Sequence, residues 1–182
     1  MGLARYHAKR HFDRTPEPQG KQPDARRSGL RFVVQKHAAT SLHYDFRLEM
    51  EGVLRSWAVT KEPTEELGVK RLAVHTEDHP LEYASFEGEI PEPEYGAGHV
   101  EIWDRGTWIP DDEPVAAFRR GRLKFTLKGR KLKGAWALVR MGNAQTRKRD
   151  LWLLMKLADR TRASPPPRGK RGAPREERRA AR

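Results

Sequence analysis

The segment from Leu42 to Glu49 alternates strictly between apolar and polar side chains, and this period of two constrains the fold more than any other feature of the sequence. Successive side chains of a β-strand point to opposite faces. One face of this strand is therefore apolar, with Leu42, Tyr44, Phe46 and Leu48. The other face carries His43, Asp45, Arg47 and Glu49. Glu51-Gly52 then predicts a tight turn into a second strand, Val53–Val59, so that the two form a hairpin.

Further short strands are expected at hairpin-like spacing along the chain. They are Phe32–Lys36, Arg71–Thr76, His99–Trp103, Arg122–Leu127, Ala135–Arg140 and Leu151–Met155. Turn signals separate several of them, at Asp104-Arg105-Gly106, Lys128-Gly129-Arg130 and Gly142-Asn143. Helix is expected only at Val115–Arg120 and as a single turn near the start. This pattern predicts a mainly β protein, either an antiparallel barrel or a sandwich.

The net charge of +12 is concentrated at the two ends of the sequence. Residues 1–31 carry eight Lys or Arg against three acids, and residues 160–182 carry nine against two, so the body between them is neutral. We expect a basic N-terminal arm over 1–30, a β-barrel domain over 31–159 and a disordered basic tail over 160–182. Basic ends suit a polyanion, because each neutralised phosphate releases counterions. Solvated tails that aid solubility explain the same charge equally well.

Several classes of protein are disfavoured by what the sequence lacks. There is no cysteine and no apolar run approaching the roughly 20 residues that span a bilayer, so we expect a cytoplasmic protein with no membrane partner. There is also no Gly-rich phosphate loop, no Gly-x-Ser-x-Gly elbow and no His-Glu-x-x-His pair. These absences argue against nucleoside triphosphate use, serine hydrolase chemistry and zinc-finger binding.

The polar face of the alternating strand is a candidate metal site. His43 and Asp45 lie two residues apart, so both can reach one ion, and His37 can close the site if the chain folds back over the short connection. Two imidazoles and one carboxylate suit Mn²⁺, Zn²⁺ or Fe²⁺. Arg47, next along the face, could grip an anion through two parallel N–H groups. The alternative is a solvated polar face, and His-x-Asp alone is a weak motif.

A second cluster surrounds His79. Pro80 places this histidine at a strand end or loop, where it could act as a general acid or phosphate ligand, with Tyr83 as another donor. An incidental histidine in a turn is the more ordinary explanation of this cluster alone. Lys61 and Arg71 are further candidate phosphate contacts. His7, His11 and His99 have no evident role.

Taken together, these motifs closely resemble the 3′-phosphoesterase domain of bacterial DNA ligase D. The resemblance covers about residues 9–159, through Phe32–His37, Leu42–Glu49, Gly52–Val59, Ala73–Leu81 with Tyr83, Phe86–Gly88, Tyr95–Gly98, Ile102–Gly106, Gly134–Arg140 and Leu151–Lys156. It implies an eight-stranded antiparallel β-barrel whose metal site lies in an outer groove, with the arm packed near it. It also implies a manganese-dependent enzyme that resects 3′-terminal ribonucleotides and removes 3′-phosphates during the repair of double-strand breaks by non-homologous end joining.

The resemblance assigns roles to individual residues. Its metal ligands are His37, His43 and Asp45, for Mn²⁺ or another divalent ion such as Co²⁺ or Zn²⁺. Its phosphate ligands are Arg47, His79 and Tyr83, assisted by Lys61 and Arg71, and its catalytic set is His79, Arg47, Tyr83 and Lys61. Gln35, Glu77, Arg10 and Glu17 match supporting positions. The implied substrates are 3′ ends of nucleic acid, which would associate the protein with the nucleoid, and separate ligase, polymerase or Ku-type proteins are possible partners.

The sequence departs from the family pattern in the arm and in its domains. The family usually has Arg-Asp-Phe where this chain has Arg10-His11-Phe12, so a carboxylate is lost or is replaced by Asp13. No polymerase or ligase domain follows, which favours a free-standing family member.

Two rival functions are consistent with parts of the pattern. A catalytically silent nucleic-acid-binding or scaffold domain that recruits a ligase would use the basic tails, bind ends without turnover and be indifferent to metal. A small-molecule enzyme of cupin-like build would place its metal ligands inside the barrel.

Overall fold

The computed structural model describes residues 2–20, 29–142 and 150–159. Nine strands and three short helices are assigned within these ranges, in the order α1 (Ala4–His7), β1 (Leu30–Ala38), β2 (Leu42–Met50), β3 (Val53–Val59), β4 (Lys70–His75), the 3₁₀ helix η1 (Leu81–Ser85), β5 (Gly88–Ile90), β6 (Gly98–Pro110), α2 (Pro114–Arg120), β7 (Arg122–Gly129), β8 (Lys133–Arg140) and β9 (Leu151–Lys156). The expected C-terminal tail, 160–182, lies outside the described residues. None of the helices in the described ranges has the length and apolar character needed to cross a bilayer.

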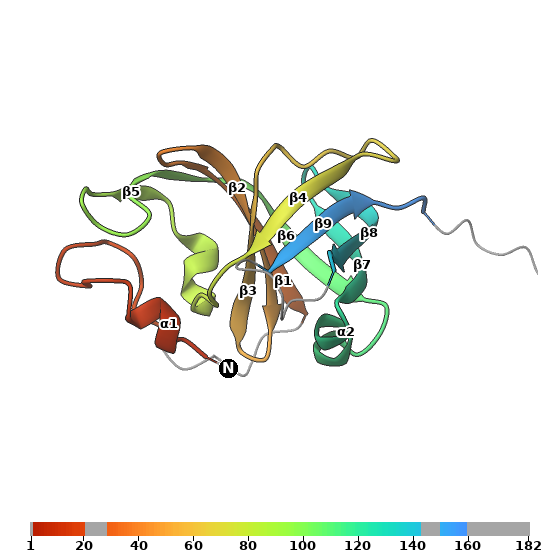
Figure 1. The fold of residues 1–182 in the computed structure, drawn as a ribbon, viewed down its shortest axis with the longest axis horizontal. Helices are drawn as coiled ribbons and strands as arrows, with labels where there is room; N and C mark the ends of the chain where they lie inside the picture. The colour runs from red at the N-terminus through yellow and green to blue at the C-terminus, as the bar shows by residue number, and fades with distance from the viewer. Residues whose placement is uncertain (1, 21–28, 143–149, 160–182) are drawn as a thin grey trace, which may run out of the picture.

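Eight of the strands close into an antiparallel barrel (Figure 1). Their order is β1-β2-β3-β4-β9-β8-β7-β6, and β6 pairs back onto β1, so the ring has no free edge. The short β5 adds to the beginning of β6 outside the ring. The closed eight-stranded barrel confirms the fold expected from the alternation and from the resemblance.

The expected strands and the α2 helix are all present, and so is the single helical turn near the start. One prediction is wrong: Asp104-Arg105-Gly106 is not a turn, because β6 runs through it as a 13-residue strand. Asp104 is buried and its carboxylate accepts backbone N–H bonds from Arg130, Lys131 and Leu132, so it closes the next turn rather than its own. The polar side chain of Asp104 therefore caps a turn elsewhere in the sequence and does not indicate a turn at its own position.

The barrel interior is filled by aromatic and aliphatic side chains. Tyr44, Phe46 and Leu48 of β2 point into it, together with four buried tryptophans, Trp57, Trp108, Trp136 and Trp152. Leu42, expected on the same face, is instead 51% exposed because it lies at the very start of β2. The packed interior leaves the opposite face of β1, β2 and β3 to carry function.

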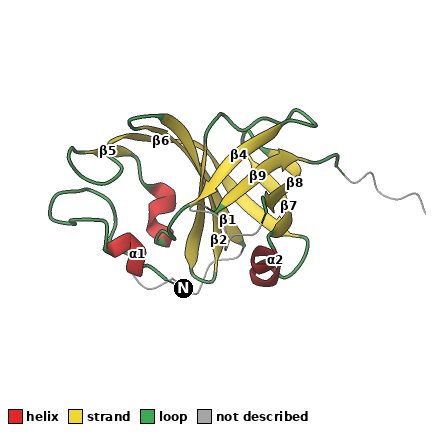
Figure 2. Cartoon of the chain, viewed as in Figure 1, coloured by secondary structure: helices red, strands yellow, loops and turns green. Residues whose placement is uncertain are grey.

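A second apolar cluster lies on the outside of the barrel wall. It joins the N-terminal arm, η1, β5 and the outward faces of β3 and β6 through Tyr6, Leu54, Tyr83, Phe86, Ile90 and Val100. Figure 2 shows α1 and η1 gathered at the same side of the barrel, with α2 at another. The arm and η1 therefore cover part of the outer wall, and the polar face of β2 lies beside this cover.

Candidate functional site

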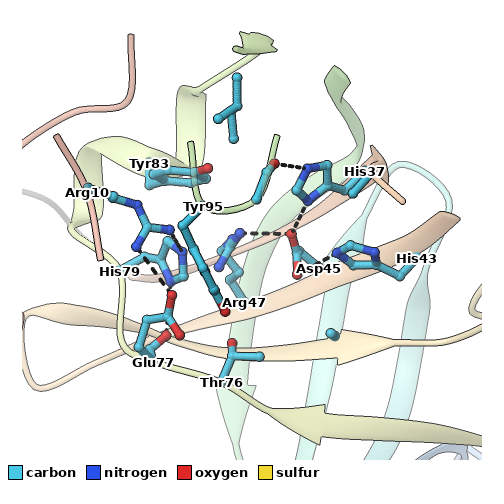
Figure 3. Close-up of a pocket in the computed structure, with 14 residues that line it drawn as sticks. Arg10, His37, His43, Asp45, Arg47, Thr76, Glu77, His79, Tyr83 and Tyr95 are labelled. Carbon is cyan, nitrogen blue, oxygen red and sulfur yellow. Dashed lines mark hydrogen bonds and ion pairs between the residues drawn. The ribbon is translucent and has the colours of Figure 1, made fainter. Parts of the chain in front are cut away.

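The outward side chains of β1, β2 and β3 form the floor of a pocket of about 350 Å³. Antiparallel pairing sets His37 opposite His43, Gln35 opposite Asp45, and Arg47 opposite Ser56. The walls come from the arm, from the segment 76–83 and from the loop before β6, with Arg10, Glu77, His79, Tyr83 and Tyr95 (Figure 3). Hence the pocket unites the two polar clusters of the sequence, which lie more than 30 residues apart.

His37, His43 and Asp45 converge at one end of the pocket. One ligand-type atom from each lies within 4.8 Å of the other two. His37 Nδ1 is 3.4 Å from Asp45 Oδ2, and His43 Nε2 is 3.7 Å from Asp45 Oδ1. These residues lie on the outer wall, opposite the face that packs the barrel core, so the cupin-like arrangement with ligands inside the barrel is not the one observed.

The remaining ring nitrogen of each histidine faces a backbone carbonyl. His37 Nε2 lies 2.8 Å from the oxygen of Gly96, and His43 Nδ1 lies 2.9 Å from the oxygen of Ser41. If these nitrogens carry the protons, the other nitrogens present lone pairs toward the Asp45 carboxylate. Histidine ligands of metals are typically oriented in this way by a carbonyl or carboxylate. The donor set therefore fits a divalent cation.

Arg47 links the metal-type cluster to the rest of the pocket. Its side chain is 2% exposed, and its three nitrogens donate to Gln35 Oε1, Ser56 Oγ and Asp45 Oδ2 at 2.8–3.0 Å. A guanidinium has five N–H groups, so two remain for an anion. Arg47 is buried rather than on a solvated face, and its anion-binding role stays a prediction.

The charge of Asp45 is maintained by its neighbours. Burial alone would raise the pKa of its carboxyl, but the Arg47 guanidinium and then the His37 and His43 rings outweigh burial and hold that pKa well below its usual range. The Asp45 carboxylate is consequently ionised near neutral pH, and its oxygens can only accept hydrogen bonds.

His79 lies at the opposite end of the pocket. Its Nδ1 is 3.0 Å from the oxygen of Glu77, and its Nε2 is 3.3 Å from Arg10 Nη2. Burial first, and then the charges of Arg47 and Arg10, lower the pKa of His79 well below its usual value. In this state the ring is neutral and accepts a hydrogen bond from Arg10.

The arm reaches the pocket through a buried network of charges. Arg10 Nε donates to Glu17 at 2.8 Å, and Arg10 Nη1 lies 3.3 Å from Glu77. Tyr83 donates its phenol proton to Glu17 at 2.9 Å. Burial raises the pKa of Tyr83 well above its usual value, so the phenol keeps its proton. Gln35, another expected supporting residue, donates to the backbone oxygens of Tyr83 and Phe86 and so fixes η1 against β1.

Residues 35–140 match the family described as the DNA Ligase D 3′-phosphoesterase domain. The match covers more than half of the chain and includes the pocket floor. The chain belongs to this family. The resemblance seen in the sequence is thereby confirmed.

Curated relatives of this 3′-phosphoesterase-family chain are long proteins. This chain is 52% identical over 158 residues to the multifunctional non-homologous end joining protein LigD of Pseudomonas aeruginosa. The alignment covers 86% of this chain and 19% of that protein. The chain is 45% identical over 158 residues to the multifunctional non-homologous end joining DNA repair protein LigD of Mycobacterium tuberculosis, covering 85% and 20%. For the LigD protein of Mycolicibacterium smegmatis the identity is 41% over 169 residues, covering 90% and 21%. The chain thus spans about a fifth of the length of these relatives.

Two expected phosphate contacts of the 3′-phosphoesterase-family chain lie away from the pocket lining. Lys61 follows β3 and is exposed, and Arg71 on β4 donates to the backbone oxygen of Glu62 at 2.8 Å. Neither is among the residues that line the pocket in the described part of the chain. Their roles as phosphate contacts stay predictions.

The arm residue that departs from the family pattern has a partner of its own. His11 Nδ1 lies 3.0 Å from Glu94 Oε2, while the His11 side chain is 69% exposed and that of Glu94 is 5% exposed. Asp13 is exposed and lies 3.8 Å from Arg14, so it does not replace the missing carboxylate within the pocket. His11 instead connects the arm to the loop before β6.

Sequence reasoning missed three residues of the pocket region. Ser56 contacts both Arg47 and His79, and its signal is a small hydroxyl in the middle of a strand whose other side chains, except Arg55, are apolar or aromatic. Lys9 bonds Glu77 and the Tyr95 hydroxyl, at 2.9 and 3.0 Å. Neither Lys9 nor Tyr95 stands out by pattern, because each reaches the pocket from a loop.

Proposed function

We propose that this chain is a manganese-dependent phosphoesterase of nucleic-acid 3′ ends. It removes 3′-terminal ribonucleotides and 3′-phosphates from DNA or RNA ends, and it does so in the repair of double-strand breaks. The observation that carries the proposal is the convergence of His37, His43 and Asp45 beside the buried Arg47. Family membership supports the same reaction, and the basic ends of the sequence suit a polyanionic substrate.

His37, His43 and Asp45 would hold Mn²⁺, and the same donors also suit Co²⁺ or Zn²⁺. A bound divalent cation would neutralise charge on a phosphate oxygen as the P–O bond breaks. The orientation of both imidazoles by Gly96 and Ser41 supports this assignment, because it leaves the ligand nitrogens unprotonated.

The chain's own residues would bind and activate the phosphate. Arg47 donates its two uncommitted N–H groups to phosphate oxygens, and such positioned donors are typically worth about 3–4 kcal/mol in a transition state. As the bound phosphate offsets the charges of Arg10 and Arg47, His79 would take a proton from solvent. It would then give that proton to the leaving oxygen as a water oxygen replaces this oxygen on phosphorus. Tyr83, whose phenol stays protonated, is a further donor.

The remaining expected roles concern the surroundings of the reaction. Gln35, Glu77, Arg10 and Glu17 hold the phosphate-binding side chains in place. Lys61 and Arg71 contact phosphates of the strand that leads into the pocket, and Lys61 reaches the reacting phosphate only if its flexible side chain turns inward. Ligase, polymerase or Ku-type proteins would act on the same ends, since the curated relatives are named for end joining. Such a substrate would place the protein at the nucleoid.

A gel assay on a primer–template with one 3′-terminal ribonucleotide tests the proposal. With Mn²⁺, we expect shortening first to a 3′-phosphate and then to a 3′-hydroxyl. His43→Ala should abolish this shortening, because the site loses one of its three ligands. His99→Ala is the matched control, since His99 is exposed on β6 and bonded to Glu89 outside the pocket. A primer that binds but stays intact with the unaltered protein would favour the silent binding domain instead.

A further inference from the structure

Tyr95 differs from the other tyrosines of the chain. Tyr6, Tyr44 and Tyr83 are buried and pack against other aromatic rings. Tyr95 is 49% exposed although it lines the pocket, and no aromatic ring in the described ranges stacks on it. In Figure 3 its side chain lies between Arg10 and Glu77 on one side and Asp45 on the other. An exposed aromatic ring therefore lies at the entrance of the pocket that contains Arg47 and His79.

The loop that carries Tyr95 is fixed on both sides of it. The buried Glu94 bonds His11 of the arm, and its backbone oxygen accepts from the N–H of Ala97. Gly96 has φ of +82°, a left-handed conformation that favours glycine, and its carbonyl faces His37. The position of Tyr95 is consequently tied to that of the proposed metal ligand.

The hydroxyl end of Tyr95 is fixed as well. Lys9 Nζ donates to it at 3.0 Å and lies 4.2 Å from the ring centre, while the same ammonium bonds Glu77. An exposed tyrosine with no constraints would be an ordinary surface residue. Here the hydrogen bond and the nearby ammonium restrain the ring, so less side-chain entropy is lost when a flat group binds against it.

We propose that Tyr95 is a stacking platform for the nucleobase of the 3′-terminal nucleotide. The proposal rests on the function proposed above, because a phosphate held by Arg47 and His79 puts the attached nucleoside at the pocket mouth. Every base has a π-face, so stacking on tyrosine adds affinity with little sequence preference. Tyr95 therefore selects nucleotide ends over small phosphate esters that lack a base.

The experiment compares two oligonucleotides that each carry a 3′-phosphate, one with adenine on the last nucleotide and one with an abasic last residue. Binding is measured by fluorescence anisotropy on the Mn²⁺-loaded protein, with a 3′-phosphonate version of each end that cannot be hydrolysed. Release of inorganic phosphate is measured in parallel on the cleavable ends. The variants are Tyr95→Ala, Tyr95→Phe and, as a control of similar exposure, Ile109→Ala on the far part of β6.

We expect the unaltered protein to bind the adenine end about 5- to 100-fold more tightly than the abasic end. Tyr95→Ala should remove this preference and leave affinity for the abasic end unchanged, because the abasic end already lacks the base that would stack on Tyr95. Tyr95→Phe, which keeps the ring, and Ile109→Ala should retain the preference.

The stacking proposal is overturned if Tyr95→Ala weakens both ends equally, which would indicate a role in shaping the loop, or if the unaltered protein shows no preference. The two proposals fail separately. A base preference that depends on Tyr95 without phosphate release would leave stacking intact and reject the enzyme. Equal phosphate release from both ends, by the unaltered protein and by Tyr95→Ala, would support the enzyme and reject the stacking proposal.

Discussion

Arg47 is a full positive charge at a position that is almost completely buried, and its surroundings explain how that is tolerated. A buried cation is stable only when it is paired and its donors are used. Asp45 supplies the counter-charge, and Gln35 and Ser56 take two further N–H groups. The arrangement leaves Arg47 preorganised toward the pocket, so its donors need not be reoriented when a phosphate arrives.

The depressed pKa of His79 leads to a prediction about the liganded state. A bound phosphate dianion would offset the charges of Arg10 and Arg47, two of the three main causes of the depression. We therefore expect the pKa of His79 to rise when a 3′-phosphorylated oligonucleotide binds. NMR titration of the His79 ring protons, assigned with a His79→Gln variant, measures this directly. An unchanged pKa in the bound protein would argue against His79 as the proton donor.

At this scale the sequence reveals the chemistry of β2 but not its environment. The alternation predicted correctly that His43, Asp45 and Arg47 share one face, because that depends only on strand geometry. It did not predict that Asp45 and Arg47 are buried, since their cover comes from the arm and η1. Tyr95 and Lys9 were missed for the same reason: their positions depend on contacts across more than 80 residues.

Among the elements, the N-terminal arm contributes most to the site for its size. Tyr6 is fully buried and its hydroxyl bonds the oxygen of Pro18, while Arg10 stacks 3.9 Å from the Tyr6 ring centre. Polar contacts then connect Arg10 to Glu17 and Glu77. An apolar anchor thus holds a charged segment over the pocket. Its amino-acid composition alone suggested only an extended basic arm.

Glu17→Gln should loosen this arm while leaving the barrel folded. The substitution removes the charge that pairs with Arg10 and accepts from Tyr83, and breaking a buried pair typically costs about 3–5 kcal/mol. Hydrogen exchange of residues 2–20 should accelerate, and turnover should fall. Asp13→Asn, at an exposed position of the same arm, is the matched control. If the two variants show the same hydrogen exchange over residues 2–20 and the same turnover, Glu17 does not hold the arm.

The elements illustrate what local patterns can and cannot indicate. Period-two alternation and turn residues predicted the strands that form the barrel, because these signals are local. The wrong turn prediction at Asp104 shows the limit of such local signals. In the sequence, an aspartate that caps a distant turn cannot be told from an aspartate that forms a turn at its own position. The short β5 and η1 were not predicted, and their few residues carry no periodicity.

For the whole molecule, the buried His79 and the partly buried His75 link folding to pH. Burial lowers the pKa of His75, which lies among Trp57 and Phe118, and the pKa of His79 is lowered as described above. Each histidine binds a proton more readily when the chain is unfolded. The free energy of unfolding should therefore fall as pH drops through about 6.5, the ordinary pKa of histidine.

Urea unfolding followed by tryptophan fluorescence at pH 5, 6 and 7, with metal chelated, measures this dependence. We expect the free energy of unfolding to increase with pH by up to about 1.4 kcal/mol per pH unit for each histidine. His75→Gln and His79→Gln should each flatten the slope, whatever they do to stability at pH 7. A slope that neither substitution changes would assign the dependence to other groups.

The pocket lies on the outer wall of a barrel whose interior is solid with side chains, and this geometry removes any need for threading. Under the proposed function, only the last nucleotide of a substrate has to enter, while the strand that leads into the pocket lies along the outer surface, however long it is. A product can leave by the way it came, without a channel to clear. A domain of this build can therefore work on the terminus of a chromosome-sized molecule as readily as on a short oligonucleotide.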